Sequence, residues 1–232
     1  MQRQVDVAIL GAGTAGLNAR REAEKAGRSW VLIDGGPLGT TCARVGCMPS
    51  KLLIAAAEAA HYARRASAFG VQVDPAAVRV DGAAVLRRVR EERDRFAGFV
   101  VDGVEKLPPE QVLRGHAHFV APGTLEVEGH GTVKAKAVVI ATGSRPWLPA
   151  PFDAIPLQVL TSDDLFELPR LPGAVAVIGT GIIGLELGQA LHRLDVETTF
   201  FNPFDELGLF TDPAVDRAAR RILGEELDLR LG

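Results

Sequence analysis

Residues 7–16 read VAILGAGTAG, an apolar run that ends in three glycines with the spacing G-x-G-x-x-G. The apolar run predicts a buried strand of a parallel sheet, and the residues after the glycines predict a helix that Gly27 ends. Residues 30–33 predict a second strand, which leads into Asp34. A strand, a glycine turn, a helix and a strand that ends on an acid make up the dinucleotide-binding fingerprint. We therefore expect an α/β fold of the Rossmann type.

Each glycine of the G-x-G-x-x-G turn has a physical role. Gly11 allows the tight turn, Gly13 lets a pyrophosphate approach the backbone, and Gly16 lets the helix and the strand pack closely. The N-terminus of the helix supplies amides and partial positive charge. Asp34 can accept hydrogen bonds from the ribose hydroxyls of an adenosine. Glycine turns also occur for purely structural reasons, but the complete unit favours a nucleotide site.

The fingerprint occurs twice. Residues 175–184 read VAVIGTGIIG and match residues 7–16 at an offset of 168 residues. The same offset carries Asp34 onto Asn202, at the end of an expected strand. We therefore expect two dinucleotide folds, with an insertion in the second half of the first. The second fold lacks the acid that would hold an NAD ribose and a nearby arginine suited to a 2′-phosphate, so the choice between NAD and NADP stays open.

Residues 39–51 (GTTCARVGCMPSK) contain both cysteines of the chain, Cys42 and Cys47, and end on Lys51. Two thiols beside a dinucleotide unit suggest electron transfer between a cofactor and a disulfide. A thiolate is the reactive species in such exchange, and a nearby cation or helix N-terminus favours it. Two buried cysteines that pack as small apolar residues are the alternative. Zinc is less favoured, because a structural site needs about four ligands and only His61 lies near in sequence.

Two helices and several short strands are expected between the two glycine turns. Residues 51–68 carry an apolar stripe at helical spacing, and Asp81 is expected to cap a second long helix that runs to about residue 102. Three short apolar runs with turn residues between them predict a small antiparallel meander. These runs are residues 112–120, 125–127 and 133–141, and the last one turns at Thr142 and Gly143.

A proline-rich segment separates the two folds. Four prolines fall between residues 146 and 156, which predicts a linker. We expect a first domain at residues 1–149, a linker at residues 150–172 and a partial second domain at residues 173–232. In the second domain, Asp212 and Pro213 are expected to start a last helix.

Composition excludes several classes of function. An apolar fraction of 47% and a charged fraction of 24% are ordinary for a soluble globular protein. A net charge of −3 with scattered basic residues gives no electrostatic case for nucleic acid. The first residues lack a signal-peptide pattern, no apolar run is long enough to cross a bilayer, and two cysteines are too few for a secreted disulfide scaffold. We expect a cytoplasmic protein without a nucleic-acid, membrane or metal partner.

Over its whole length the chain resembles the flavin-dependent pyridine nucleotide–disulfide oxidoreductases, and within them dihydrolipoamide dehydrogenase and its paralogues. Relatives of this kind continue beyond the position of Gly232, so the resemblance covers their N-terminal part. The most specific motif is the cysteine box, because its spacing, its Pro-Ser-Lys ending and its place after a flavin fingerprint agree. The motifs are Gly11, Gly13 and Gly16 with Asp34, the box from Cys42 to Lys51, Ala141, Thr142 and Gly143, and Gly179, Gly181 and Gly184 with Glu186.

The resemblance implies a role for each part. The first fold would hold FAD and the second a nicotinamide nucleotide, NAD or NADP. Cys42 would be the outer thiol that exchanges with a small disulfide or dithiol substrate, and Cys47 the thiol against the flavin. Lys51 would lie near the flavin and pair with Glu186, which completes the catalytic set. Cofactor contacts are assigned to Gly11, Gly13, Ala15, Gly16, Asp34, Gly39, Thr41, Lys51, Ala141, Thr142 and Gly143 for FAD, and to Gly179, Gly181, Gly184 and Asn202 for the nicotinamide nucleotide.

The sequence departs from the family pattern in ways that bear on its substrate and its activity. Thr40 and Arg44 stand where a glycine and an asparagine are usual, which suggests a paralogue with another substrate. Ser50 fits dihydrolipoamide and mercuric reductases better than glutathione reductase. Relatives also carry a returning flavin segment and an interface domain whose His-Glu pair serves the partner subunit of a homodimer. No histidine here matches that pair, so we expect this chain to be incomplete for full turnover.

A second interpretation belongs to a different class of protein. The chain would be a dinucleotide-binding module that is not an enzyme, with Cys42 and Cys47 as a thiol switch. The missing base and Asn202 favour this alternative. The disulfide substrate also stays open between lipoamide, another small disulfide and a metal ion.

Overall fold

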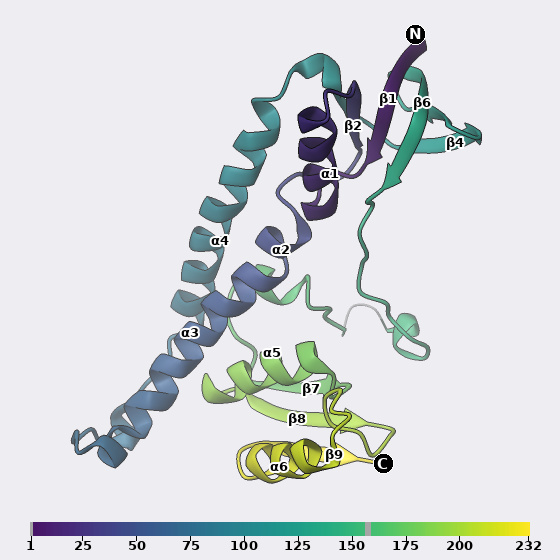
Figure 1. Cartoon of the computed structure of the whole chain (residues 1–232). Helices are drawn as coiled ribbons and strands as arrows, with labels where there is room; N and C mark the ends of the chain where they lie inside the picture. Colours follow the sequence, from purple (N-terminus) through teal and green to yellow (C-terminus); the bar gives the residue numbers. More distant parts are fainter. Residues whose placement is uncertain (1, 156–158) are drawn as a thin grey trace. The chain divides into compact units, whose positions relative to one another are not determined.

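The computed structural model describes residues 2–155 and 159–232 (Figure 1). The described residues form two compact units, each with its own sheet and its own hydrophobic core. The first unit combines the residues up to Met48 with Arg93–Ile155, and the second combines Pro49–Glu92 with the residues after 158.

The sheet of the first unit is built around β1 (Gln2–Leu10), as the glycine-turn motif predicts. β1 pairs in parallel with β2 (Trp30–Asp34) on one side and with β6 (Gly131–Ile140) on the other. The helix α1 (Thr14–Lys25) connects β1 to β2 and lies against both strands (Figure 1). The strand order is β3-β2-β1-β6-β5-β4. The expected strand, turn, helix and strand are therefore present.

Both faces of β1 and β2 are buried, which explains their continuous apolar sequences. Successive side chains of a strand point to opposite faces of the sheet. Ile9 and Leu32 accordingly join a core on one face, while Ala8 and Val31 join a second core that includes Leu125. This double burial fixes the register of the two strands and, with it, the position of the turn that follows β1.

The antiparallel part of the sheet is smaller than the sequence predicts. The run at residues 112–120 divides into β3 (Val112–Arg114) and β4 (Ala117–Ala121), and β3 pairs in parallel with β2. Among the described strands, the antiparallel pairs are β4 with β5 (Thr124–Val127) and β5 with β6. The chain divides at Gly115, where a Cβ would lie 2.5 Å from a backbone carbonyl oxygen. That close approach ends one strand and starts the next.

The two long helices are present, with one shift. α3 spans Cys47–Arg64, four residues earlier at each end than expected, because Pro49 is tolerated in the first turn of a helix, where its missing amide has no helical partner. α4 spans Gly82–Glu105. Asp81 caps it as predicted, since its carboxylate accepts hydrogen bonds of 3.0 Å from two amides of the first turn.

Residues 49–92 pack in the second unit, whereas the sequence places them in a domain at residues 1–149. Leu53 of α3 and Leu86 of α4 are fully buried in one core with Phe166. Phe166 itself lies in the segment expected to be a linker, where a short 3-10 helix carries it into the core. A single aromatic residue is a weak signal in a proline-rich sequence, so the sequence did not predict that Phe166 is buried.

The sheet of the second unit repeats the pattern of the first. β7 (Ala174–Ile178), β8 (Glu197–Asn202) and β9 (Asp228–Leu231) are parallel, in that order across the sheet. The helix α5 (Ile182–Arg193) connects β7 to β8 and lies against both (Figure 1). The helix α6 (Pro213–Gly224) connects β8 to β9. The expected second Rossmann-like fold is therefore present in part.

One element of the second unit is predicted by the sequence and one is missed. Asp212 caps α6 by accepting hydrogen bonds from the amides of Ala214 and Val215, so the expected last helix is confirmed. β9 is missed, because its four residues alternate charged with apolar side chains and carry little strand signal alone. Its pairing with β8 supplies the stability that its sequence does not show.

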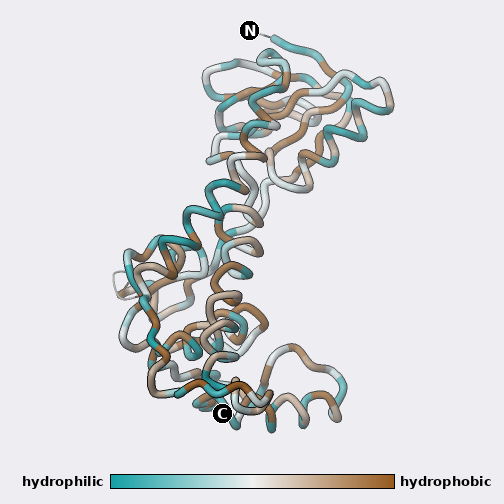
Figure 2. Tube along the Cα trace, turned by 90° about the vertical axis from the view of Figure 1, so that its left-hand side faces the viewer, coloured by the Kyte–Doolittle hydropathy of each residue, from teal (hydrophilic) through white to brown (hydrophobic). Residues whose placement is uncertain are grey.

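The helices are amphipathic rather than continuously apolar. Figure 2 shows hydrophilic and hydrophobic residues mixed along the helical segments that can be followed in this view. Over residues 2–155 and 159–232, no helix combines the length and the hydropathy that a membrane crossing requires.

Candidate functional site

The first glycine turn joins β1 to α1 and leaves open space at its middle glycine. Gly11 has a φ of +103°, and a Cβ on it would lie 2.2 Å from the carbonyl oxygen of Ala141. A Cβ on Gly16 would lie 1.8 Å from the carbonyl oxygen of Gly11. At Gly13, no atom of the described chain lies within 4 Å of such a Cβ. The outer glycines are needed for packing. The open one is the N-cap of α1, beside the exposed Ala15, and the N-terminus of a helix attracts a pyrophosphate through its amides and its partial positive charge.

Asp34 lies at the end of β2, beside the same turn. Its two carboxylate oxygens accept hydrogen bonds from the amides of Ala12, at 2.6 Å, and Gly36, at 2.7 Å. Each oxygen has a second lone-pair direction, so the carboxylate can still accept from a ribose hydroxyl. The two amides therefore hold Asp34 in position for the role expected of it.

Arg114 and His116 flank Asp34, and sequence analysis missed both. A guanidinium nitrogen of Arg114 lies 3.7 Å from the Asp34 carboxylate, and another donates a hydrogen bond to the carbonyl of Gly36. The His116 ring packs over Gly35, where a Cβ would lie 2.7 Å from its Nδ1. The two residues belong to β3 and the turn after it, so only the pairing of β3 with β2 brings them here.

The end of β6 closes the other side of the turn. The amide of Ala141 donates a hydrogen bond of 2.8 Å to the carbonyl of Leu10, which places the expected Ala-Thr-Gly segment directly beside Gly11. Thr142 is exposed, and Gly143 has a φ of +71°, so the chain turns sharply away here. Of the residues assigned to FAD by resemblance, the structure brings together those of the glycine turn, Asp34 and this segment.

The two cysteines lie together at the start of α3. Cys42 belongs to the short helix α2 (Thr41–Arg44), and Cys47 is the first residue of α3. Both are thiols, and the Cys42 thiol makes a hydrogen bond with the Cys47 side chain that raises the pKa of Cys42; burial and the Cys47 charge raise it further. The backbone amides of Cys47 and Met48 donate to the Cys42 sulfur and oppose that rise. The spacing of the box therefore places one sulfur at a helix N-terminus and against the other sulfur.

The geometry before the cysteines is strained. Gly39 has a φ of +112° and Thr40 a φ of +63°, a region that L-residues other than glycine rarely adopt. Thr40 is held there as the N-cap of α2, because its hydroxyl accepts a hydrogen bond of 3.2 Å from the amide of Ala43. A glycine at this position would adopt the same angle without strain. Thr41 follows as the first residue of α2.

The expected pair of Lys51 and Glu186 is present within the second unit. The Lys51 Nζ donates a hydrogen bond to Glu186 Oε1. Lys51 follows Cys47 by one turn of α3, and Glu186 lies on α5. Burial tends to raise the pKa of Glu186, but hydrogen bonds from Lys51 and Ser50 and the charge of Lys51 hold it below its ordinary value. Ser50 is a member of this group that sequence analysis did not assign.

The second glycine turn reproduces the first. Gly179 has a φ of +97°, and a Cβ on Gly184 would lie 2.5 Å from the carbonyl oxygen of Gly179. Gly181 is the N-cap of α5, and within the described residues nothing lies within 4 Å of a Cβ placed on it. The open middle glycine suits a second pyrophosphate for the same reason as the first.

Asn202 occupies the position of Asp34 and is held by a different set of contacts. Its Nδ2 donates to the hydroxyl of Thr180, at 2.7 Å, and to the carbonyl of Glu206, at 3.0 Å. Its Oδ1 accepts a hydrogen bond of 3.2 Å from the amide of Phe204. Unlike Asp34, the side chain offers no charged acceptor to a ribose.

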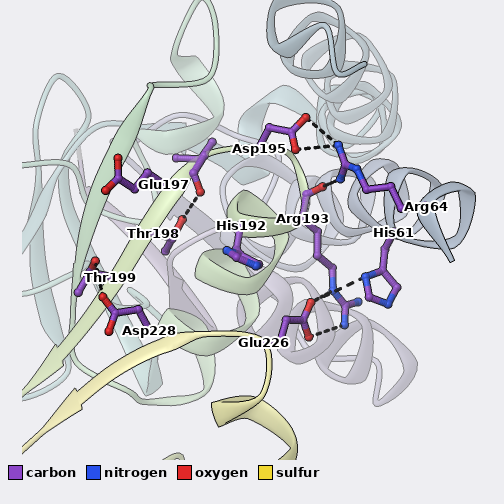
Figure 3. Close-up of a pocket in the computed structure, with 11 residues that line it drawn as sticks. His61, Arg64, His192, Arg193, Asp195, Glu197, Thr198, Thr199, Glu226 and Asp228 are labelled. Carbon is purple, nitrogen blue, oxygen red and sulfur yellow. Dashed lines mark hydrogen bonds and ion pairs between the residues drawn. The ribbon is translucent and has the colours of Figure 1, made fainter. Parts of the chain in front are cut away.

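An open pocket of about 730 Å³ lies elsewhere in the second unit (Figure 3). Figure 3 shows Arg193 and His61 both directed at Glu226, and Arg64 directed at Asp195. These contacts include a hydrogen bond of 2.5 Å from Arg193 Nε to Glu226 and two of 2.7 Å from Arg64 to Asp195. The pocket adjoins the start of β8, the opposite end of the strand from Asn202. Its lining includes no residue that the sequence assigns to catalysis or to a cofactor.

Among the residues that the structure describes, no group of three or more His, Cys, Asp or Glu side chains is placed to hold a metal ion. The first unit contributes a glycine turn and the two thiols, and the second unit contributes a glycine turn and the lysine–glutamate pair.

Comparison with known proteins decides the family. The family described as pyridine nucleotide-disulphide oxidoreductase matches residues 5–231. The chain belongs to this family. Pyridine nucleotide-disulphide oxidoreductases use FAD and NAD(P), and the two glycine turns with open middle glycines fit two such nucleotides. Asp34 suits the adenosine of the first.

Individual relatives point to two named activities. A mercuric reductase of Lysinibacillus sphaericus is 33% identical over 95% of this chain and 40% of its own length. A dihydrolipoyl dehydrogenase of Bacillus subtilis is 33% identical over 96% of this chain and 48% of its own length. The chain thus spans about half the length of the curated relatives it matches, or less.

A solved structure supports the fold. The Cu(II) complex of the HOCl-induced flavoprotein disulfide reductase RclA from Escherichia coli superposes with a TM-score of 0.79 over 97% of this chain and 48% of that one, at 22% identity. This likeness confirms the expected α/β class, a Rossmann-like FAD-binding fold with an antiparallel meander and part of a second Rossmann-like fold.

Proposed function

We propose that this chain carries the flavin and redox-thiol part of a dihydrolipoyl dehydrogenase-like oxidoreductase, which moves electrons between a nicotinamide nucleotide and a small disulfide or dithiol. The observation that supports this most is the thiol pair. The Cys42 sulfur receives two amides at the N-terminus of α3 and is in hydrogen-bonding contact with Cys47. A contact between two sulfurs is the arrangement from which a disulfide forms when the pair is oxidised.

FAD would supply a two-electron relay between the nicotinamide nucleotide and the thiol pair. Gly13 and the α1 amides would bind its pyrophosphate, and Asp34 would orient its adenosine ribose. Gly181 and the α5 amides would bind the pyrophosphate of NAD or NADP. Lys51 and Glu186 would act on the flavin side of the thiol pair, as the family resemblance implies.

In the direction of substrate reduction, the Cys42–Cys47 disulfide would take up two protons and two electrons and become two thiols. The two electrons come from the reduced nicotinamide nucleotide, which is oxidised. The Cys42 thiolate attacks one sulfur of the substrate disulfide, so a mixed disulfide forms and the first substrate thiol leaves. The Cys47 thiolate then attacks the Cys42 sulfur, which restores the internal disulfide and releases the second substrate thiol. A dithiol substrate drives the same steps in reverse.

The proposed function also includes a cellular compartment, an oligomeric state and a substrate class. We place the protein in the cytoplasm, where a cysteine pair is kept available for exchange rather than locked in a structural disulfide. By family resemblance, the active enzyme would be a homodimer in which the partner subunit supplies the proton-transfer base. The substrate class includes lipoamide-like small disulfides.

The visible spectrum of the protein purified with added FAD tests the proposal. We expect a yellow protein that gains a long-wavelength thiolate-to-flavin band on reduction. Cys47→Ser should remove this band, whereas Cys42→Ser should keep it, and both variants should keep the circular dichroism of the parent. A folded protein that stays colourless with FAD overturns the proposal and supports the alternative, a nucleotide-binding module with a thiol switch.

A further inference from the structure

A buried serine adjoins the Lys51–Glu186 pair. Ser50 precedes Lys51 on α3, is only 8% exposed, and donates a hydrogen bond to the Glu186 carboxylate. The two partners of the ion pair are more accessible, with side-chain exposures of 65% for Lys51 and 25% for Glu186. The Glu186 carboxylate therefore receives one hydrogen bond from an exposed ammonium and one from a buried hydroxyl.

An ion pair with an exposed lysine holds that lysine only weakly when neither side chain is fixed by another contact. Fixing two long side chains costs conformational entropy, and solvent screens their attraction, so such pairs contribute little. Ser50 has a short side chain, so ordering its hydroxyl costs little conformational entropy. Its hydrogen bond restricts the Glu186 rotamer before Lys51 binds to it. The buried contact is therefore the one that defines where the carboxylate lies.

Helix chemistry gives no other reason for a serine here. Serine has a lower helix propensity than alanine, since its hydroxyl competes for backbone groups. At a buried helix position, an alanine of nearly the same size would favour the helix. The hydroxyl is directed instead at a charged partner on another helix, α5.

We propose that Ser50 is a positioning residue, which fixes the Glu186 carboxylate so that the Lys51 ammonium is held at one point, one turn after Cys47 on α3. This inference rests on the proposed function, in which Lys51 serves the flavin side of the thiol pair. Ser50 touches neither thiol in this role and acts only through Glu186. Its effect should therefore disappear when Glu186 can no longer carry a charge.

The test compares Ser50→Ala with Ser50→Thr, which keeps a hydroxyl, in protein without added nucleotide. The pKa of Glu186 is followed by NMR of carboxyl-labelled glutamate. Because a hydrogen bond to the charged form lowers a carboxyl pKa, Ser50→Ala should raise it and Ser50→Thr should return it toward the parent value. Thermal unfolding of each variant confirms that the compared proteins are folded.

A second readout follows Lys51 itself. Ser50→Ala should make the Lys51 amine react with an acylating reagent about threefold to tenfold faster, the range for losing one hydrogen bond to a charged group at a partly exposed site. Lys25, which pairs with Glu22 at 2.7 Å on α1, is the internal control and should keep its rate. In a Glu186→Gln background, Ser50→Ala should add nothing further.

An unchanged Glu186 pKa and an unchanged Lys51 rate in a folded Ser50→Ala protein overturn the inference. So does a Ser50→Ala effect of equal size in the Glu186→Gln background, which would show that Ser50 acts by another route. Neither measurement uses FAD. A failure here is therefore distinct from a failure of the proposed function, which the visible spectrum reports.

Discussion

The two nucleotide turns of this chain share a backbone and differ in one side chain. The helix after the first turn spans Thr14–Lys25, and the helix after the second spans Ile182–Arg193, which is the same range moved by 168 residues. In both turns the first glycine has a positive φ, the third packs against the first, and the second faces open space. The repeat therefore preserves the space for a pyrophosphate in both folds.

The difference lies where the adenosine ribose is expected. In the first unit, the side chain is a carboxylate, Asp34, which accepts two hydrogen bonds from amides. In the second unit, Asn202 accepts one from an amide and donates to the hydroxyl of Thr180, the residue that replaces Ala12. The same position of the fold is thus a charged acceptor in one unit and a neutral, internally paired amide in the other. Between the two units, the backbone of the turn is the same while the side chain expected to recognise the ribose differs.

The largest expected effect is the loss of the first turn in Gly16→Ala. The added Cβ would lie 1.8 Å from the carbonyl oxygen of Gly11, so the turn must move. Overpacking a tight site costs about 1–3 kcal/mol, and more when backbone atoms must shift. Chemical denaturation should show a free energy of unfolding lowered by at least this amount.

Two variants control for this effect. Gly13→Ala adds the same atom to the same turn without a contact, so its unfolding should match the parent. Gly184→Ala, with a gap of 2.5 Å to Gly179, should destabilise less than Gly16→Ala. Equal destabilisation by Gly13→Ala and Gly16→Ala would contradict the division of labour among the glycines.

An intermediate effect is expected when the open glycines are filled. Gly13→Ala should weaken FAD binding, and Gly181→Ala should weaken NADH binding, because each methyl group occupies the space through which a pyrophosphate approaches the backbone. We expect at least a tenfold loss, about 1.4 kcal/mol, in titrations followed by flavin fluorescence or calorimetry. Each variant should leave the other nucleotide unaffected. Loss of both nucleotides in either variant would show that the turns do not act separately.

The sequence predicts the parts of this comparison that depend on local pattern. Apolar runs buried on both faces, glycine spacing and the helix caps at Asp81 and Asp212 each leave a signal within a few residues. The pairing of β3 with β2, which brings Arg114 and His116 to Asp34, depends on residues about 80 positions apart and leaves none.

The same limit explains what was missed in the second unit. β9 is stabilised by β8 rather than by its own four residues. Phe166 shares its core with residues of α3 and α4 that lie more than 70 positions earlier in the chain, such as Leu86 and Val89. Ser50 is part of the cysteine box in the sequence, but its burial and its contact with Glu186 are known only from the three-dimensional structure. Sequence motifs therefore identify the candidate reactive residues, whereas the residues that surround them are identified only from tertiary contacts.

The smallest expected effect comes from exchanging the acid and the amide between the two units. Asp34→Asn removes the charge and turns a donor toward the amide of Ala12 or Gly36, so FAD affinity should fall about tenfold, in line with one hydrogen bond to a charged group.

Asn202→Asp adds a charged acceptor for the ribose of NADH. It also loses the Nδ2 hydrogen bonds to Thr180 and Glu206, and it faces a carbonyl oxygen with a carboxylate. These opposing changes should leave a gain in NADH affinity of about threefold or less, well below the loss at Asp34. Calorimetric titration of each variant with FAD and with NADH measures both effects, and the unfolding midpoint shows whether the fold is kept. If Asp34→Asn left FAD affinity unchanged, the amide contacts of Asp34 would be its whole role, and the two units would be chemically alike after all.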